Sequence, residues 1–467
     1  MNRYLSILFV FIITSAGSQT QDSIILSFSE YLGYVKKYHP IAKQAELTLQ
    51  FGQASLMKAR GGFDPKIEVD NERKKFKNLE YFDQLNATFK IPTWYGIELK
   101  GNFEQNDGAF LNPQNFVPED GLYSAGISAS LGQGLFINKR MADLKKAKFF
   151  NEQTKADREM LINQILYDAS LAYFNWLQAY NEIQIYTQFL ANAEIRFQGV
   201  KRSAENGDKA AIDSVEAGIT VKNRALGLEQ SRVKLMKASL ELSTFLWLND
   251  NIPVEVQPNV IPDAFVENTI DDVLEISGLP LTDFVVENHP KLRSLSFKYE
   301  GLEVDKRLKA NKLLPKVDIQ YNFLTETADI ARSFNTNQYK GGFNIAFPLF
   351  LRKERGDLRL AKTKLQDLQF EMDDARITIQ NKVLAIYREL ESFETQNQLL
   401  EDIVNDYTTM LNAEDRKFSF GESSLFLINS REKSLIDSQL KSVELQNKFL
   451  KAKAKLFNSL SRDLENL

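Results

Sequence analysis

The chain has 467 residues, of which 43% are hydrophobic, and a formal net charge of −4 at pH 7. This length predicts two or three domains, or a single body built by duplication, and the charge argues against a polybasic nucleic-acid binder. Cysteine is absent, which excludes disulfides, a thiolate nucleophile, a cysteine-ligated metal site and a lipid-acceptor cysteine.

Residues 1–18 have the pattern of a secretory signal peptide. Arg3 supplies the positive charge, an apolar core runs from Leu5 to Ile13, and small residues follow at 16–18. The apolar core is too short to span a bilayer, so we expect an exported mature protein; an uncleaved N-terminal anchor is the alternative. No later segment holds eighteen consecutive apolar residues, and an exported chain can still enter a membrane as a closed barrel of strands.

Two expected helical segments, 26–62 and 281–313, carry the same landmarks in the same order. Each holds a His-Pro pair, and each is followed by a Pro-Lys pair where the helix is expected to give way to a strand. The landmarks are His39, Pro40 and Pro65 in the first copy and His289, Pro290 and Pro315 in the second. Each pair is separated by 250 residues (39 to 289, 40 to 290, 65 to 315). A period this long indicates a duplicated unit rather than a solenoid, and we expect each His-Pro pair to mark a bend in its helix.

Segments of alternating hydrophobicity follow the landmarks in both copies. They occur at 67–69, 85–91, 97–103 and 127–131 in the first copy and at 317–323 and 343–347 in the second. The offset between copies then falls from 250 to 216 (Tyr123 to Tyr339), so the first copy carries 34 extra residues. We expect about four membrane-spanning strands per protomer, which cannot close a barrel, because the smallest outer-membrane barrels use eight. A trimer that shares twelve strands is the economical solution, and the extra residues either enlarge its outer end or form a side hairpin.

Long helices complete each copy. The apolar positions of 352–420 repeat at threes, fours and sevens, as in a coiled-coil seam, and at about 1.5 Å per residue this helix is roughly 100 Å long. Glycines at 207 and 421 are expected to turn the chain into shorter returning helices, on which the helices 26–62 and 281–313 stack end to end. The expected organisation is a signal peptide (1–18), a first repeat (19–248), a proline-rich equatorial connector (249–280) and a second repeat (281–467).

Three sets of motifs occur in a defined order and spacing: the His-Pro and Pro-Lys landmarks, the run 342–350, and the turns at 202–207 and 416–421. With these motifs, the chain resembles the TolC family of outer-membrane efflux proteins. The resemblance covers essentially the whole mature chain. It implies a mixed α/β membrane protein: a homotrimer with a periplasmic α-barrel of long coiled-coil helices and a twelve-stranded β-barrel, four strands per protomer, in outer-membrane lipid. It also implies a passive exit duct of an efflux or secretion system, docked to a periplasmic adaptor and an inner-membrane transporter.

In that family the two helical turns form the periplasmic tip, where the adaptor docks and the pore closes. By motif, Gly207 and Gly421 are those turns, and Asp213 resembles a carboxylate that ties the closed tip together; an ordinary surface carboxylate is the alternative for Asp213. Arg202 and Arg416 either contact the adaptor, form ion pairs across the tip, or are ordinary solvated charges.

The second turn departs from the family pattern. Leu427, Ile428, Asn429 and Ser430 stand where the family places aspartates, so the usual acidic ring is not reproduced. Glu422 either replaces it with a ring of three charges or is a solvated tip residue.

Nothing in the sequence supports catalysis, a metal site or a cofactor. No phosphate loop, G-x-S-x-G or H-E-x-x-H motif occurs. The two histidines, the only ones in the chain, have no accompanying ligand cluster, so a structural role at the helix break is favoured over metal binding. We therefore expect a conduit without enzymatic activity; the alternative is an exported coiled-coil structural or adhesion protein.

Overall fold

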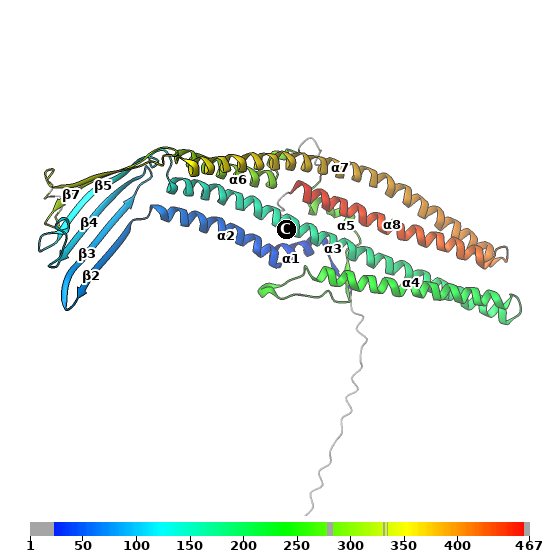
Figure 1. The fold of residues 1–467 in the computed structure, drawn as a ribbon. Helices are drawn as coiled ribbons and strands as arrows, with labels where there is room; N and C mark the ends of the chain where they lie inside the picture. Colours follow the sequence, from blue (N-terminus) through cyan, green and yellow to red (C-terminus); the bar gives the residue numbers. More distant parts are fainter. Residues whose placement is uncertain (1–22, 278–283, 330–331, 334, 462–467) are drawn as a thin grey trace, which may run out of the picture.

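The computed structural model describes residues 23–277, 284–329, 332–333 and 335–461. The expected signal peptide, residues 1–18, lies outside the described residues. The chain is elongated: a β-sheet forms one end, and long helices run from the sheet to two turns at the other end (Figure 1). This confirms the expected mixed α/β fold, which consists mostly of long helices with a β domain at one end.

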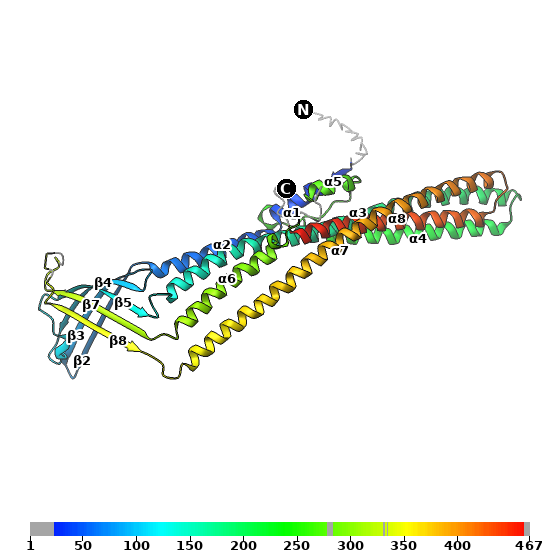
Figure 2. The same ribbon diagram turned by 90° about the horizontal axis from the view of Figure 1, so that it is seen from above.

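The helices form a layer whose neighbours change along its length (Figures 1 and 2). Near the sheet, α2 packs on α3, α3 on α6 and α6 on α7, whereas near the turns α4 packs on α3, α3 on α8 and α8 on α7. The bounds are α1 Phe28–Tyr38, α2 Pro40–Arg60, α3 Lys139–Glu205, α4 Ala211–Ser243, α5 Val266–Val273, α6 Pro290–Asn311, α7 Arg352–Ser419 and α8 Leu425–Leu460. With 67 and 68 residues, α3 and α7 run the whole length of the layer. Among the described residues, no helix is both long and apolar enough to cross a membrane.

The first His-Pro pair joins two helices end to end. His39 lies directly before α2, and its Nδ1 accepts a hydrogen bond from the Ile41 backbone N–H at 3.2 Å. The same ring hydrogen-bonds the backbone of Thr244, the residue that ends α4. Because Nδ1 is the acceptor, the proton donated to Thr244 is on Nε2. One neutral imidazole therefore satisfies a free donor at the start of α2 and connects it to the end of α4, where the Thr244 carbonyl also accepts the Trp247 indole N–H at 2.8 Å.

The second His-Pro pair repeats this joint. Nδ1 of His289 accepts the Lys291 backbone N–H at 3.1 Å, and the ring hydrogen-bonds the backbone of Ser459 in the last turn of α8. The expected stacking of short helices on returning helices is thereby confirmed. The expected bend occurs only in the first copy, where α1 precedes α2; the described residues before α6 form a short 3-10 turn at Val286–Asn288.

One antiparallel sheet carries six strands in the order β2-β3-β4-β5-β7-β8. The bounds are β2 Lys66–Phe76, β3 Leu79–Pro92, β4 Ile97–Asp107, β5 Leu122–Gly132, β7 Lys316–Thr325 and β8 Tyr339–Ala346. Four membrane-spanning strands per protomer were expected, and the sheet has two more. The physical reason is that the extra residues of the first copy add a hairpin whose backbone groups pair within the sheet. Pro65 and Pro315 lie directly before β2 and β7, where strands were expected to begin.

One face of this sheet is apolar and the other is polar. Paired residues point to the same face and successive residues to opposite faces, so the pairing registers assign each side chain to one face. The apolar face carries Ile67, Val69, Leu85, Phe89, Ile91, Leu99, Phe103, Tyr123, Ile127, Leu131, Val317, Ile319, Phe323, Phe343 and Ile345. The polar face carries Glu68, Asp70, Lys90, Asn102, Ser128, Asp318, Lys340 and Asn344, among others.

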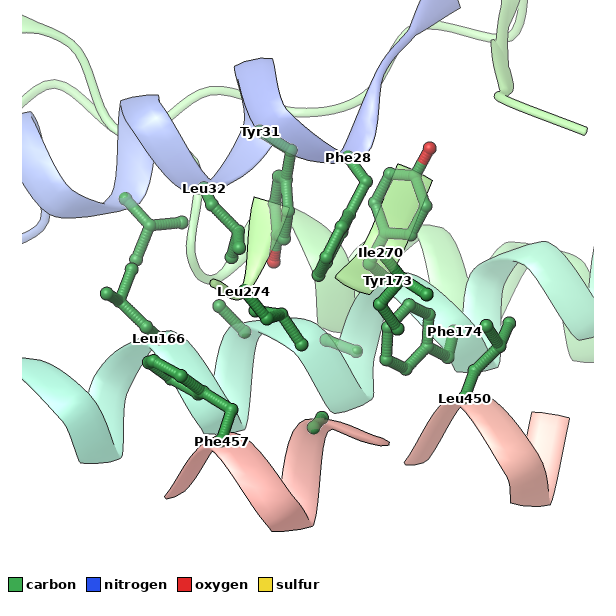
Figure 3. Packing of buried hydrophobic residues seen from close by; sticks show 14 of the residues in the cluster. Phe28, Tyr31, Leu32, Leu166, Tyr173, Phe174, Ile270, Leu274, Leu450 and Phe457 are labelled. Atoms are coloured by element: carbon green, nitrogen blue, oxygen red, sulfur yellow. The ribbon is translucent and has the colours of Figure 1, made fainter. Parts of the chain in front are cut away.

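The largest buried cluster lies midway along the layer and holds the helices together there (Figure 3). Phe28 of α1 packs its ring 5.2 Å from that of Tyr173 and 5.0 Å from that of Phe174, both on α3. The Tyr173 hydroxyl donates to the Leu26 carbonyl at 2.7 Å and accepts the Asp263 N–H at 3.1 Å. It thereby ties the parallel strands β1 (Ile24–Leu26) and β6 (Val260–Pro262) to the long helix.

Candidate functional site at the helical tip

Two turns of the same construction end the helical layer, far from the sheet. Gly207 has a φ of +84°, and the N–H of Asp208 donates at 2.9 Å to the carbonyl five residues earlier. Gly421 has a φ of +77°, and the N–H of Glu422 makes the equivalent hydrogen bond at 2.8 Å. Both are Schellman caps, in which a left-handed residue lets the following N–H reach a free helix carbonyl. Glycine suits this conformation because it has no Cβ, and the two predicted turn positions are confirmed.

The two turns pack against each other. Lys209 of the first turn places its Nζ 3.8 Å from the centre of the Phe418 ring, which precedes the second turn. Beneath this contact, Val200, Ala217 and Leu425 are buried together. A cation–π contact and an apolar cluster therefore hold the first hairpin, α3 and α4, against the second, α7 and α8.

Four predicted tip residues lie where a contact with another molecule is possible. Arg202 and Arg416 are exposed in the last turns of α3 and α7, where positive charge favours the helix dipole. Asp213 lies in the first turn of α4, and Glu422 is exposed in the second turn. In the described part of this single chain, none of the four side chains forms an ion pair. Their expected roles in the gate or in docking stay predictions.

The segment that replaces the family aspartates serves packing within the chain. Ile428 is fully buried. The Asn429 side-chain amide donates to the Glu216 carboxylate at 3.2 Å, which links α8 to α4. Ordinary packing and one polar contact therefore occupy this position. The described residues also hold no group of three or more His, Asp or Glu side chains arranged for a metal ion.

A buried ion-pair cluster near the tip was not predicted from the sequence. Glu432 on α8 has 0% of its surface exposed. One carboxylate oxygen lies 3.1 Å from Nη1 of Arg196 on α3, and the other lies 3.3 Å from Nη2 of Arg224 on α4. Arg196 also lies 3.6 Å from Asp415 on α7. Charges on four helices of both hairpins therefore meet at one point.

One sequence signal points to this cluster. Leu425, Ile428 and Leu435 lie on the buried stripe of α8 at spacings of three and seven, and Glu432 falls on the same stripe, four residues after Ile428. A charged residue at a core position of a helix needs a partner of opposite charge. The partners are not visible in the sequence, because Arg196 and Arg224 belong to other helices.

A family model matches the second copy of the repeat. Residues 282–462 match the model described as outer membrane efflux protein. No curated protein sequence gives a significant match.

Solved structures share the fold over nearly the whole chain. The CmeC outer membrane channel of Campylobacter jejuni superposes with a TM-score of 0.66 at 12% identity, covering 93% of this chain and 85% of that one. VceC of Vibrio cholerae gives a TM-score of 0.67 at 12% identity, with coverages of 94% and 97%. The open state of the MtrE outer membrane channel of Neisseria gonorrhoeae gives 0.66 at 12%, with coverages of 94% and 89%. The chain therefore has the fold of these outer membrane channels.

Proposed function

We propose that this chain belongs to the outer membrane efflux protein family, whose model matches its second copy, and is one subunit of a homotrimeric exit duct in the bacterial outer membrane. The observation that supports it most strongly is the sheet, which is apolar on one face and polar on the other across all its strands. A strand set of this kind suits a barrel wall, with the apolar face on lipid and the polar face on a water-filled lumen.

The helical layer gives the duct its length. At about 1.5 Å per residue, α3 and α7 each extend roughly 100 Å from the sheet. With the sheet in the outer membrane, the tip therefore lies deep in the periplasm. Cargo enters at the tip and leaves through the sheet end, without chemistry on the way.

Exposed apolar side chains on the two outer helices of the layer, α4 and α7, support an oligomer. On α4, Ile212, Ile219, Leu226, Val233 and Leu240 repeat every seven residues and remain exposed. On the opposite edge, α7 exposes Leu399 and Ile403 at the level of α4, and Phe370, Ile377 and Leu384 nearer the sheet, where α2 is the outer helix of the other edge. Heptad-spaced apolar residues are the seam of a coiled coil, so the α7 edge of one copy suits the α4 edge of the next, and three copies close the tube.

The tip is the proposed contact with a periplasmic adaptor, which connects the duct to an inner-membrane transporter. Phe420 and Phe426 are large apolar side chains at the second turn with 80% and 69% of their surface exposed. Together with the exposed Arg202, Arg416 and Glu422 they form a mixed apolar and charged surface at the end of the molecule.

Membrane extraction separates this function from the alternative of an exported coiled-coil structural or adhesion protein. An integral duct stays in the outer-membrane fraction through washes in high salt and carbonate, and detergent releases it as a trimer. Release by salt or carbonate without detergent would favour the structural protein, because a sheet that is not embedded in lipid has no reason to remain.

A further inference from the structure

We propose that the wall of this duct in the membrane has eighteen strands, because β8 of each copy pairs with β2 of a second copy of the same chain. The inference rests on the proposed trimer and goes beyond it by assigning the copy-to-copy contact of the sheet and the width of the channel.

All six strands have the character of wall strands. The hairpin of β2 and β3 adds two strands to what would otherwise be a four-stranded sheet. It stays in the sheet, because β3 pairs with β4 from Asp83 to Pro92. Its apolar side chains, such as Val69 and Phe89, lie on the same face as those of β4 to β8. A hairpin that left the wall to plug the lumen or cover its mouth would have no need of this continuous apolar face.

The other face of the hairpin is polar, as expected of strands that line a water-filled lumen. Glu68 of β2 forms an ion pair with Lys90 of β3 on the polar face. Towards the far end of the hairpin the apolar face also becomes charged, and Arg73 pairs with Glu80 at 2.5 Å and lies 3.6 Å from Asp83. The hairpin is thus amphipathic near the helices and carries charges on both faces farther along, as a barrel strand does when it extends beyond the lipid.

The two edge strands have complementary features. Because the sheet has an even number of antiparallel strands, β8 of one copy and β2 of the next run antiparallel when placed side by side. Ile67 on β2 and Phe343 on β8 expose 75% and 77% of their surface. In lipid, no water is present to hydrogen-bond the backbone N–H and C=O groups of an unpaired edge strand. An edge with exposed apolar side chains therefore needs a partner strand.

The helices place these edges on the same seam as the rest of the trimer. β2 follows α2 and β8 precedes α7, and α2 and α7 are the outer helices of the layer beside the sheet. The seam between copies, which joins α7 to α4 of the next copy near the tip and to α2 near the sheet, therefore continues directly into the β8 to β2 contact.

The girths of the two tubes agree only for eighteen strands. Strands about 4.8 Å apart and tilted by about 40° give a circumference of roughly 110 Å for eighteen strands and roughly 75 Å for twelve. The helical tube beside the sheet has four helices per copy, α2, α3, α6 and α7. At about 8–10 Å between axes, twelve helices give roughly 100–120 Å. At this tilt, an eighteen-stranded wall therefore matches the helical tube in circumference.

Disulfide cross-linking tests the wall, because the natural chain has no cysteine. Asp70→Cys on the polar face of β2 is combined in turn with Lys340→Cys, Gly342→Cys and Asn344→Cys on the polar face of β8. In one copy these strands lie at opposite edges, roughly 24 Å apart, far beyond the Cα separation of about 7 Å that a disulfide allows. Any disulfide therefore joins two copies.

The matched control is Asn102→Cys on β4, combined with the same three β8 variants. A wall of four strands per copy would place β4, not β2, beside the neighbouring β8. We expect oxidation to give covalent dimers and trimers on non-reducing gels for at least one Asp70→Cys pair and for none of the Asn102→Cys pairs. Links from Asn102→Cys alone, or from neither set in a protein that is trimeric by mass, overturn the eighteen-stranded wall and leave the duct intact. A protein that is monomeric by mass in mild detergent removes the proposed trimer itself.

Discussion

Replacing Glu432 with glutamine should loosen the contact between the two helical hairpins near the tip. The carboxylate on α8 is the shared partner of Arg196 on α3 and Arg224 on α4, at 3.1 and 3.3 Å. Glutamine keeps the shape but removes the negative charge, and leaves two guanidinium groups, each only 13% exposed, facing a neutral amide.

The expected cost follows from this burial. Removing one partner of a buried ion pair costs about 3–5 kcal/mol. The arginines keep some contact with water, and Asp415 remains 3.6 Å from Arg196, so we expect about 2–4 kcal/mol for Glu432→Gln. Since about 1.4 kcal/mol corresponds to a tenfold change in an equilibrium, local opening of α4 and α8 should become roughly 30- to 900-fold more frequent.

Hydrogen exchange of the full-length protein in detergent, followed by mass spectrometry, measures this opening. Exchange should accelerate in peptides from the tip half of α4 and α8 and stay unchanged in the sheet. The control is Glu444→Gln on the same helix, where the exposed carboxylate pairs with Lys448 one turn away at 2.7 Å. Such a pair contributes about 0.3–0.5 kcal/mol, so exchange should change by about twofold or less. Equal effects of the two substitutions, or wild-type exchange in Glu432→Gln, would refute this account of the cluster.

Two further predictions concern the gate and the helix joints. Asp213→Ala should raise single-channel conductance in a planar bilayer if Asp213 tethers the closed tip, whereas Asp208→Ala, at an exposed carboxylate of the adjacent turn, should not; unchanged conductance in Asp213→Ala removes that residue from the gate. Burial lowers the pKa of His39, and burial followed by the Lys382 charge lowers the pKa of His289 to about 4. Folding therefore favours the neutral rings, and the melting temperature should be constant above about pH 6.5 and fall as the pH drops from there towards 4. The double variant His39→Asn, His289→Asn should lose much of this acid-dependent fall, and an identical pH profile would contradict the joint.

The histidine joints show how far the sequence predicts the fold. Their recurrence at one offset predicted a duplicated architecture and a structural role, and the structure agrees. The acceptors of the two rings, Thr244 and Ser459, follow from no local pattern, because each lies at the far end of a helix that returns from the tip. Sequence periodicity locates helices and turns, but contacts between helices depend on the tertiary arrangement.

The number of strands in the sheet shows a second limit of prediction from the sequence. The alternation at 67–69 and 85–91 was visible in the sequence, yet alternation alone does not tell a wall strand from a side hairpin. The backbone pairing of β3 with both β2 and β4 shows that the hairpin is part of the same sheet, and its place in the wall is the inference that the cross-linking tests. At the tip, the glycine turns were predictable from the demand for a left-handed residue, whereas the Glu432 cluster was not, because its charges come from four helices.

Conductance of the purified full-length protein in planar bilayers tests most directly whether the chain forms a water-filled duct through the outer membrane. We predict discrete and reproducible current steps of one unit size, produced by the trimer and absent from preparations denatured before reconstitution. Protein that inserts as a trimer but gives no current steps, in the wild type and in Asp213→Ala alike, would contradict a continuous duct.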